Sequence, residues 1–301
     1  MLVCPLTHQL LRRVALADAE RDGGRFEACD RTGSASRAVG RTDEVMLRED
    51  GLVAYPIVRR VPILLAPELL ARGSAVRTFD LQHPHYAEAY QEMEFYNESA
   101  LNEGELAESE AMLRPMLALS AAERARFPEP LELWVDAVYD AAAQYECYDH
   151  LAPVTGQVAM QLGGKGLHTV KLILAGAREG WLLTPMVGEA TWAIALATRL
   201  GVADRLRVAV GIAEELPFAD RSIDAIYSGG CVHHMSTGSA FKEISRILAP
   251  GGRFAAAEPW KTPWYAAGVA VFGKREANAF CRPLTRERLA PLDSAFDRAT
   301  V

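Results

Sequence analysis

The sequence lacks any apolar run of about 20 residues, the length that a membrane-spanning helix needs. It also lacks a signal-peptide core, because Thr7, His8 and Gln9 interrupt the apolar residues that follow Met1. Its 32 Lys and Arg residues form no tract and are outnumbered by 39 Asp and Glu, which gives a formal net charge of -7. Such a chain lacks the cluster of basic residues that binds a nucleic-acid backbone. We therefore expect a cytoplasmic protein without a membrane or nucleic-acid partner.

Cysteine is scarce as well, and the spacing of the cysteines is not that of a disulfide framework. An odd number of cysteines without regular spacing fits a reducing compartment and predicts no disulfides. The 5 cysteines are Cys4, Cys29, Cys147, Cys231 and Cys281. What the 301 residues do have is 50% hydrophobic side chains, enough to bury a large core in one large domain or two unequal ones. We therefore expect a globular protein whose thiols are structural.

The first 165 residues divide into a β-rich part and a helical part. Residues 1–72 contain Gly/Ser/Asp-rich interruptions and, over 52–67, a stretch typical of two short strands around a turn. Residues 73–165 have apolar side chains at three- and four-residue spacing, together with the capping-box sequence Ser120-Ala-Ala-Glu123. This helical part either covers a pocket as a lid or packs on a sheet without a role in chemistry.

Residues 166–301 alternate helix and strand. The pattern predicts strands over 181–185, 207–210, 225–228 and 253–258, and helices over 169–177, 190–200 and 239–248. Such alternation indicates an α/β fold with a doubly wound, mostly parallel sheet. Ligands of such sheets bind beyond the carboxyl ends of the strands. We therefore expect the functional site at that edge of the sheet.

Three segments of this last part carry a family resemblance. Leu216-Pro-Phe begins a stretch that ends with the strand at Ser228, a helix follows over 240–248, and Pro-Gly-Gly stands at 250–252. In this order and spacing, the segments resemble the second half of class I S-adenosylmethionine-dependent methyltransferases. The resemblance implies a Rossmann-like methyltransferase fold. It also implies an acidic turn against the adenine, a strand end beside the methyl group, and a turn into the fifth strand.

The cofactor-binding half of this resemblance is predicted to be degenerate. The family binds its cofactor through a glycine-rich turn between a strand and a helix, with an acid before it. The resemblance places this turn over 182–190, where Gly188 alone remains of the glycines. Thr184 stands in place of the acid, and Met186 puts a bulky side chain where a glycine permits close approach. Each change fills or neutralises the place of the cofactor.

A second departure concerns the number of elements. The helix predicted over 190–200 leads directly into the strand before Glu214, so one strand and helix of the family pattern is predicted to be missing and the sheet to be reduced. We therefore expect no bound cofactor. If S-adenosylmethionine does bind, Gly188, Glu189 and Glu214 are the residues expected to hold it.

The N-terminal part carries a weaker resemblance. Its two ends, 2–5 and 55–65, resemble the zinc-ribbon-like activator subunit of RNA and protein methyltransferases. A tetrahedral zinc site takes four nitrogen or sulfur ligands, usually in close pairs. Where a ribbon would have paired Cys-x-x-Cys knuckles, this chain has Cys4 with His8 and a single Cys29. We therefore expect a ribbon-like module without zinc.

Candidate catalytic residues follow the strands predicted to end at Ser228 and Glu258. His233 and His234 come shortly after the first of these strands, and histidine titrates near neutral pH, so either could move a proton. Glu258 ends the other strand and could attract a cationic amine. The alternatives stay open: either histidine could be packing, and Glu258 could pair with a neighbouring cation. Cys231 is more typical of a small buried residue than of a nucleophile.

The helical part offers a second set of candidates, Tyr96, Asn97 and Asp149. They lie in segments that mix aromatic and acidic residues, and in the methyltransferases that this chain resembles such segments close over the substrate. A half-buried helix face with solvated charges has the same composition. Both interpretations stay open.

Three functions remain from the sequence. The first is a methyltransferase-like enzyme that positions a small molecule without S-adenosylmethionine, for example for ring closure by an amine as in bacterial natural-product pathways, with a carboxylate or histidine as base. The second is a working S-adenosylmethionine-dependent methyltransferase of small molecules. The third is a scaffold subunit whose exposed sheet edge is covered by a partner chain.

Overall fold

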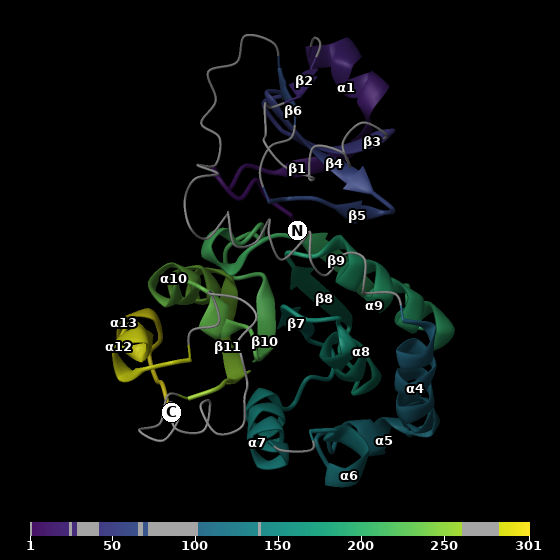
Figure 1. Cartoon of the computed structure of the whole chain (residues 1–301), viewed down its shortest axis with the longest axis vertical. Coiled ribbons are helices and arrows are strands. Elements are labelled where there is room, and N and C mark those ends of the chain that lie inside the picture. The colour runs from purple at the N-terminus through teal and green to yellow at the C-terminus, as the bar shows by residue number, and fades with distance from the viewer. Residues whose placement is uncertain are drawn as a thin grey trace, which may run out of the picture.

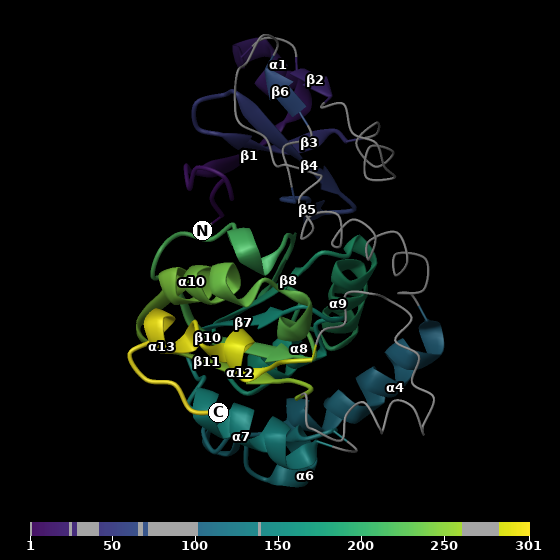
Figure 2. The same ribbon diagram turned by 60° about the vertical axis from the view of Figure 1, so that its left-hand side comes forward.

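The structure is a computed structural model, and it describes residues 2–23, 26–28, 42–65, 69–71, 102–137, 140–260 and 283–301. Two sheets form its frame: a six-stranded sheet built from the N-terminal part and a five-stranded sheet built from the C-terminal half. Figures 1 and 2 show the smaller unit lying against one side of the larger one. Among the described residues, no helix is both long and apolar enough to cross a membrane.

The N-terminal sheet is antiparallel, with the order β1-β3-β4-β6-β2 and with β5 paired to β4. Its elements are β1 (Leu11–Ala15), α1 (Leu16–Gly23), β2 (Phe26–Ala28), β3 (Glu44–Arg48), β4 (Val53–Val58), β5 (Val61–Pro62) and β6 (Leu69–Ala71). The two strands predicted over 52–67 are β4 and β5. Arg59 and Arg60 join them with positive φ angles of 50° and 71°, the backbone that a two-residue hairpin turn requires. A small β-rich unit at the N-terminus is thereby confirmed.

The helical part follows. Its described elements are α4 (Glu103–Leu113), η1 (Arg114–Ala118), α5 (Ala121–Arg124), α6 (Leu131–Trp134) and α7 (Ala141–Leu151). The capping box is confirmed, because the Ser120 hydroxyl accepts from the Glu123 N–H and the Glu123 carboxylate accepts from the Ser120 N–H. In Figure 1, α4 lies alongside the helices of the α/β unit, and α7 packs under the parallel sheet.

The parallel sheet has the order β9-β8-β7-β10-β11, and every pair in it is parallel. Its strands are β7 (Val158–Leu162), β8 (Glu179–Thr184), β9 (Leu206–Val210), β10 (Ile223–Gly229) and β11 (Leu248–Ala257). The chain starts at the centre, runs outward to β9, and then returns to the other side of β7. This is the doubly wound arrangement, and the order reverses between β7 and β10. The predicted α/β fold class is confirmed.

The helices of this unit are α8 (Leu167–Leu174), α9 (Val187–Arg199), η2 (Ala213–Glu215), η3 (Val232–His234), α10 (Thr237–Ile247), α12 (Arg286–Leu289) and α13 (Leu292–Ala295). Of these, α8, α9 and α10 match the three helices predicted from periodicity to within a few residues. The prediction of a missing strand and helix is wrong, because the overlooked strand β7 precedes the predicted helix α8 and completes that unit. Since β7 begins at Val158, the boundary predicted at residue 166 does not mark the start of the α/β unit.

The β7 strand escaped the sequence pattern because it is buried on both faces. Its five residues, Val-Ala-Met-Gln-Leu, pair with β8 on one side and β10 on the other. A central parallel strand is a nearly continuous apolar run without alternation. A run of this length cannot be told from a helix segment by periodicity alone.

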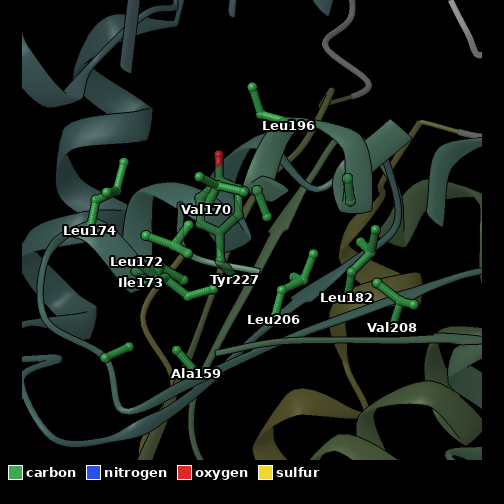
Figure 3. Packing of buried hydrophobic residues seen from close by; sticks show 14 of the residues in the cluster. Ala159, Val170, Leu172, Ile173, Leu174, Leu182, Leu196, Leu206, Val208 and Tyr227 are labelled. Atoms are coloured by element: carbon green, nitrogen blue, oxygen red, sulfur yellow. The ribbon is translucent and has the colours of Figure 1, made fainter. Parts of the chain in front are cut away.

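Each face of the parallel sheet has its own core. Leu182 of β8 points to the face covered by α7, α8 and α9, whereas its neighbours Trp181 and Leu183 point to the face covered by α10 and the N-terminal sheet. This alternation follows from the two-residue repeat of a strand. Figure 3 shows the first core, with Val170 and Ile173 of α8 lying over the strands. Each such fully buried side chain contributes on the order of 1.5–3 kcal/mol.

The N-terminal sheet meets the parallel sheet at the β9 edge. The Leu64 N–H donates to the Val210 carbonyl at 2.7 Å, and Ile63 forms a parallel bridge with Val210. The Val3 N–H donates to the Pro217 carbonyl at 3.0 Å. A sheet edge needs such a partner, because its unpaired backbone groups otherwise invite association. At this end of β9 the same chain therefore covers the edge of the parallel sheet.

Candidate functional site

A pocket of about 340 Å³ opens at the carboxyl ends of β7, β8, β9 and β10. This is the edge of the sheet where ligands of doubly wound folds bind. The loop after each strand contributes to the lining, which includes Gly163, Met186, Glu189, Glu214, Gly229 and His234. A volume in this range fits a small organic ligand. The pocket is therefore the candidate functional site.

The glycine-rich turn of the site follows the central strand β7. Gly163, Gly164 and Gly166 have φ angles of 74°, 73° and 84°, a region in which glycine carries no steric penalty. The buried Gln161 orders this turn: its side-chain NH₂ donates to the Gly163 carbonyl at 2.7 Å, and its carbonyl accepts from the Thr169 N–H at 2.9 Å. Sequence reasoning placed the glycine turn over 182–190, one strand too late. Three glycines directly after a short apolar run were the signal that could have located it.

The segment 182–190 forms the second wall of the pocket. Thr184 ends β8 and is buried, and its hydroxyl donates to Glu189 Oε2 at 2.5 Å. The same hydroxyl accepts from the Met186 N–H at 3.3 Å. Of the predicted cofactor residues here, Glu189 lines the pocket and is 7% exposed, whereas Gly188 is buried in the first turn of α9, outside the lining. A carboxylate therefore enters the pocket from α9, although the strand end itself has none.

Glu214 lines the third wall of the pocket. It lies in η2 directly after β9, beside Ile212 and Ala213 of the same lining. Glu214 Oε1 accepts from the Ser236 N–H at 2.7 Å, and Ser236 precedes the first turn of α10. The contact fixes this carboxylate between two loops of the pocket rim.

The predicted catalytic residues His233 and Glu258 are brought together, but away from the pocket lining. Glu258 Oε1 accepts from the N–H groups of Cys231 and Val232, both at 2.8 Å. Glu258 Oε2 accepts from the His233 N–H at 3.2 Å and lies 2.8 Å from His233 Nδ1. The two side chains are only 8% and 4% exposed. Their contacts hold the η3 turn, and His234, whose ring centre lies 4.2 Å from that of His233, lines the pocket.

The remaining candidates lie elsewhere. Asp149 is exposed on α7 and does not line the pocket. Tyr96, Asn97 and Cys29 lie outside the described residues.

The thiol and imidazole considered for a zinc site point in different directions. Cys4 is fully buried, with its Sγ 3.2 Å from the Tyr55 hydroxyl. His8 Nε2 lies 3.9 Å from a carboxylate oxygen of Glu243 on α10. Within the part of the chain that the structure describes, no three His, Cys, Asp or Glu side chains are grouped so as to hold a metal ion.

Part of the chain is similar to known proteins. Residues 176–256 match the family model described as methyltransferase domain. The chain is 50% identical to the uncharacterized protein YafE of Escherichia coli (strain K12) over 44 residues, which are 14% of this chain and 21% of that protein. It is 34% identical to an uncharacterized methyltransferase of Mycobacterium tuberculosis (strain H37Rv) over 85 residues, 26% of this chain and 35% of that one. The chain thus spans only about a fifth to a third of these relatives.

Solved structures resemble the α/β unit. A geranyl diphosphate C-methyltransferase from Streptomyces coelicolor A3(2), in complex with S-adenosyl-L-homocysteine, is 21% identical with a TM-score of 0.42, over 48% of this chain and 54% of that one. The [4+2]-cyclase SpnF is 24% identical with a TM-score of 0.43, over 50% and 55%. The strand order and the match over 176–256 show that the parallel sheet and its helices have a Rossmann-like methyltransferase fold.

Proposed function

We propose that this chain is a methyltransferase of small molecules that binds S-adenosylmethionine in the pocket at the carboxyl ends of the strands. The observation that carries the proposal is the glycine turn at 163–166, which opens onto a pocket that two carboxylates, Glu189 and Glu214, also line. Two reasons for expecting no cofactor were a degenerate glycine turn over 182–190 and a missing strand and helix. The glycine turn lies instead over 163–166, between β7 and α8. When bound, S-adenosylmethionine supplies a methyl group activated by its sulfonium.

The glycine turn suits the amino-acid end of this cofactor. Gly163 and Gly164 line the pocket without side chains, so backbone groups can approach a ligand closely. Gln161 holds the turn through neutral hydrogen bonds, the task that the family gives to an acid.

Glu189 suits the ribose. A carboxylate accepts hydrogen bonds from two vicinal hydroxyl groups, and such charge-assisted bonds are stronger than neutral ones. In the family, this acid belongs to the end of the second strand, where Thr184 stands here. The Thr184 hydroxyl instead orients the Glu189 carboxylate, so the acid reaches the pocket from α9.

The loop after β10 suits the reacting groups. By resemblance, this strand end borders the methyl group. Gly229, Cys231, His234 and Met235 line the pocket there. Neutral imidazole is a base suited to physiological pH, so His234 is placed to accept a proton from a methyl acceptor.

A second candidate function is the positioning of a small molecule for ring closure without S-adenosylmethionine. One observation favours it: Gln161 and Thr184, both neutral, occupy the two strand ends where the family has acids. In that case the pocket would act by orienting the reacting groups, which can supply several kcal/mol of the barrier.

Calorimetric titration with S-adenosylmethionine and S-adenosylhomocysteine separates the two functions. We expect micromolar dissociation constants, because a complete glycine turn and a carboxylate for the ribose account for most of the contacts. If neither ligand binds at millimolar concentration, the methyltransferase proposal fails and the second candidate remains.

A variant tests the assignment of Glu189. Glu189→Gln should weaken S-adenosylhomocysteine roughly 10- to 100-fold through loss of charge-assisted hydrogen bonds. Affinity for the 2′-deoxyribose analogue should change much less, because that ligand cannot offer both hydroxyl groups. Glu146→Gln, on the exposed face of α7, is the matched control. An equal loss for both ligands would place Glu189 away from the ribose.

A further inference from the structure

A second group of polar side chains lies between α7, α8 and β10, separate from the residues that line the pocket. We refer to it as the α7–α8 polar cluster. Its members are Asp136, Gln144, Tyr148, His168, Lys171 and Tyr227. The methyltransferase proposal uses none of them.

The two charged side chains of this cluster, Lys171 and Asp136, form an ion pair. Lys171 is fully buried, and its ammonium donates to the Trp134 carbonyl at 2.7 Å and to Asp136 Oδ1 at 2.8 Å. The Gln144 NH₂ group donates to the same carboxylate oxygen at 2.8 Å. A buried ion pair of this kind adds little net stability, because desolvation offsets the attraction.

Three uncharged ring side chains lie next to this ion pair. The Tyr148 hydroxyl is 2.5 Å from His168 Nδ1, and the Tyr227 ring lies 4.3 Å from the His168 ring, centre to centre. Burial, together with the charge of Lys171, lowers the pKa of His168 to about 3. Burial raises the pKa values of Tyr148 and Tyr227 above their ordinary value. All three groups are therefore neutral at physiological pH.

Two pocket-lining glycines, Gly229 and Gly164, lie next to residues of the cluster in space or along the chain. The Tyr227 hydroxyl lies against Gly229, where a Cβ atom would come within 3.0 Å of it, and Gly229 lines the pocket. His168 is the second residue of α8, which begins directly after the glycine turn whose Gly164 lines the pocket. His168 is partly exposed as a residue although it does not line the pocket, and no described residue forms a hydrogen bond with its Nε2. Tyr148 and Tyr227 are buried, so His168 is the most exposed of the three ring residues.

We propose that His168, held by Tyr148 and Tyr227, binds an uncharged hydroxyl group of the methyl acceptor beside the pocket. The inference rests on the proposed function, since it names the class of acceptor for the same site.

The chemistry of the ring selects a hydroxyl group. Neutral imidazole has one donor and one acceptor nitrogen, and Tyr148 occupies Nδ1, so Nε2 is a donor or an acceptor according to the tautomer. A hydroxyl group can both donate and accept, and it satisfies either tautomer. An ammonium group could only donate and would lie near the buried Lys171 charge. A carboxylate could only accept a hydrogen bond, and its desolvation beside the Asp136 charge would be unfavourable.

Three ring compounds of different charge test this inference. Phenol, benzoate and benzylamine are titrated into the protein saturated with S-adenosylhomocysteine, and into the protein alone, with binding followed by ligand-observed NMR. We expect phenol to bind the complex more tightly than either charged compound. His168→Phe, which keeps a ring of similar size, should weaken phenol binding at least tenfold and leave the affinity for S-adenosylhomocysteine within twofold. His168→Gln serves as a second variant should the phenylalanine not fold.

The control is His150→Phe, which changes an exposed histidine at the end of α7. Absence of phenol binding to the complex, equal phenol binding by the His168 variant, or tighter binding of benzylamine would each overturn the inference. The titration of S-adenosylhomocysteine itself reports separately on the proposed function. If that ligand fails to bind while phenol binding still depends on His168, the cofactor assignment is wrong but the hydroxyl site is retained.

Discussion

Gly163 is a residue at which backbone conformation and packing both exclude a side chain. Its φ is 74°, and a Cβ atom there would lie 2.3 Å from Cys231 Sγ and 2.8 Å from Cys231 Cβ. Positive φ costs a non-glycine residue on the order of 1–3 kcal/mol, and overpacking adds a similar amount. We predict that Gly163→Ala lowers the free energy of unfolding by about 3 kcal/mol, measured by urea denaturation. It should also weaken S-adenosylhomocysteine binding, because the turn and the Cys231 loop both line the pocket.

The control for this substitution is Gly156→Ala. Gly156 has a φ of 77° with nothing within 4 Å of the Cβ position, so it carries the backbone cost without the collision. The Gly163 variant should therefore lose about 1–3 kcal/mol more than the Gly156 variant. Equal losses in the two variants would mean that Cys231 moves aside freely and that packing does not restrict this position.

Part of the candidate site could be predicted from single residues, and part could not. His233 and Glu258 follow neighbouring parallel strands, so their proximity follows from topology alone, and they are 2.8 Å apart. Which of two consecutive histidines faces the pocket depends on the backbone of η3, and the sequence carries no signal for it. Gln161 was missed because the glycine turn was expected over 182–190, whereas the amide of Gln161 orders a turn that begins at Gly163.

At the scale of elements, the η3 turn depends on contacts from two distant segments. Glu258 after β11 accepts from three of its N–H groups. Arg288 of α12 donates to the carbonyl groups of His233 and Met235 at 3.1 and 2.8 Å. A short 3₁₀ turn has too few internal hydrogen bonds to hold its shape alone. The position of His234 in the pocket therefore depends on these external partners.

We predict that Glu258→Ala lowers the free energy of unfolding by about 3 kcal/mol or more, because three partly buried N–H groups and the His233 ring lose their acceptor. Glu258→Gln keeps one acceptor oxygen and should lose less. Urea denaturation of both variants checks the order, with Glu287→Ala, an exposed glutamate of α12, as control. A loss below about 1 kcal/mol for the alanine variant would show that the turn holds without the carboxylate.

The elements themselves were predictable to different degrees. The amphipathic α10 has its buried residues, such as Phe241 and Ile244, at a spacing that only a helix gives. The central strand β7 has the opposite character: Met160 faces one core and Ala159 the other, so no periodicity marks it. A one-unit error at β7 then shifted the expected glycine turn to the next strand. The strand that contributes most to the site was therefore the least visible in the sequence.

At the scale of the whole molecule, the two sheets share one core. Tyr55 of β4 and Leu64 after β5 belong to the same buried cluster as Phe218 and Met160 of the α/β unit. The N-terminal sheet also supplies the backbone partner of Val210 at the β9 edge. Because Val210 is followed directly by the pocket residues Gly211 and Ile212, the N-terminal sheet supports one wall of the pocket.

The stability of the whole chain should depend on pH through His168. Its pKa falls from an ordinary value of 6.5 to about 3 in the folded chain, owing to burial and the Lys171 charge. Between these two values the unfolded chain binds a proton that the folded chain does not, so the free energy of unfolding falls as the pH is lowered. The neighbouring Tyr148, Tyr227 and Asp136 do not titrate in this window. The pKa values of Tyr148 and Tyr227 are raised, and that of Asp136 is lowered below its ordinary value of 3.8.

We therefore predict that wild type loses up to about 2.5 kcal/mol more than His168→Phe between pH 7 and pH 4.5, since each pH unit below 6.5 costs about 1.4 kcal/mol. Urea denaturation at several pH values measures the difference, and His150→Phe, exposed on α7, should follow wild type. Parallel curves for wild type and His168→Phe would mean that the pKa of His168 is the same in the folded and unfolded chain. The ring would then lack the buried environment described for the cluster, so this measurement tests the cluster without any ligand.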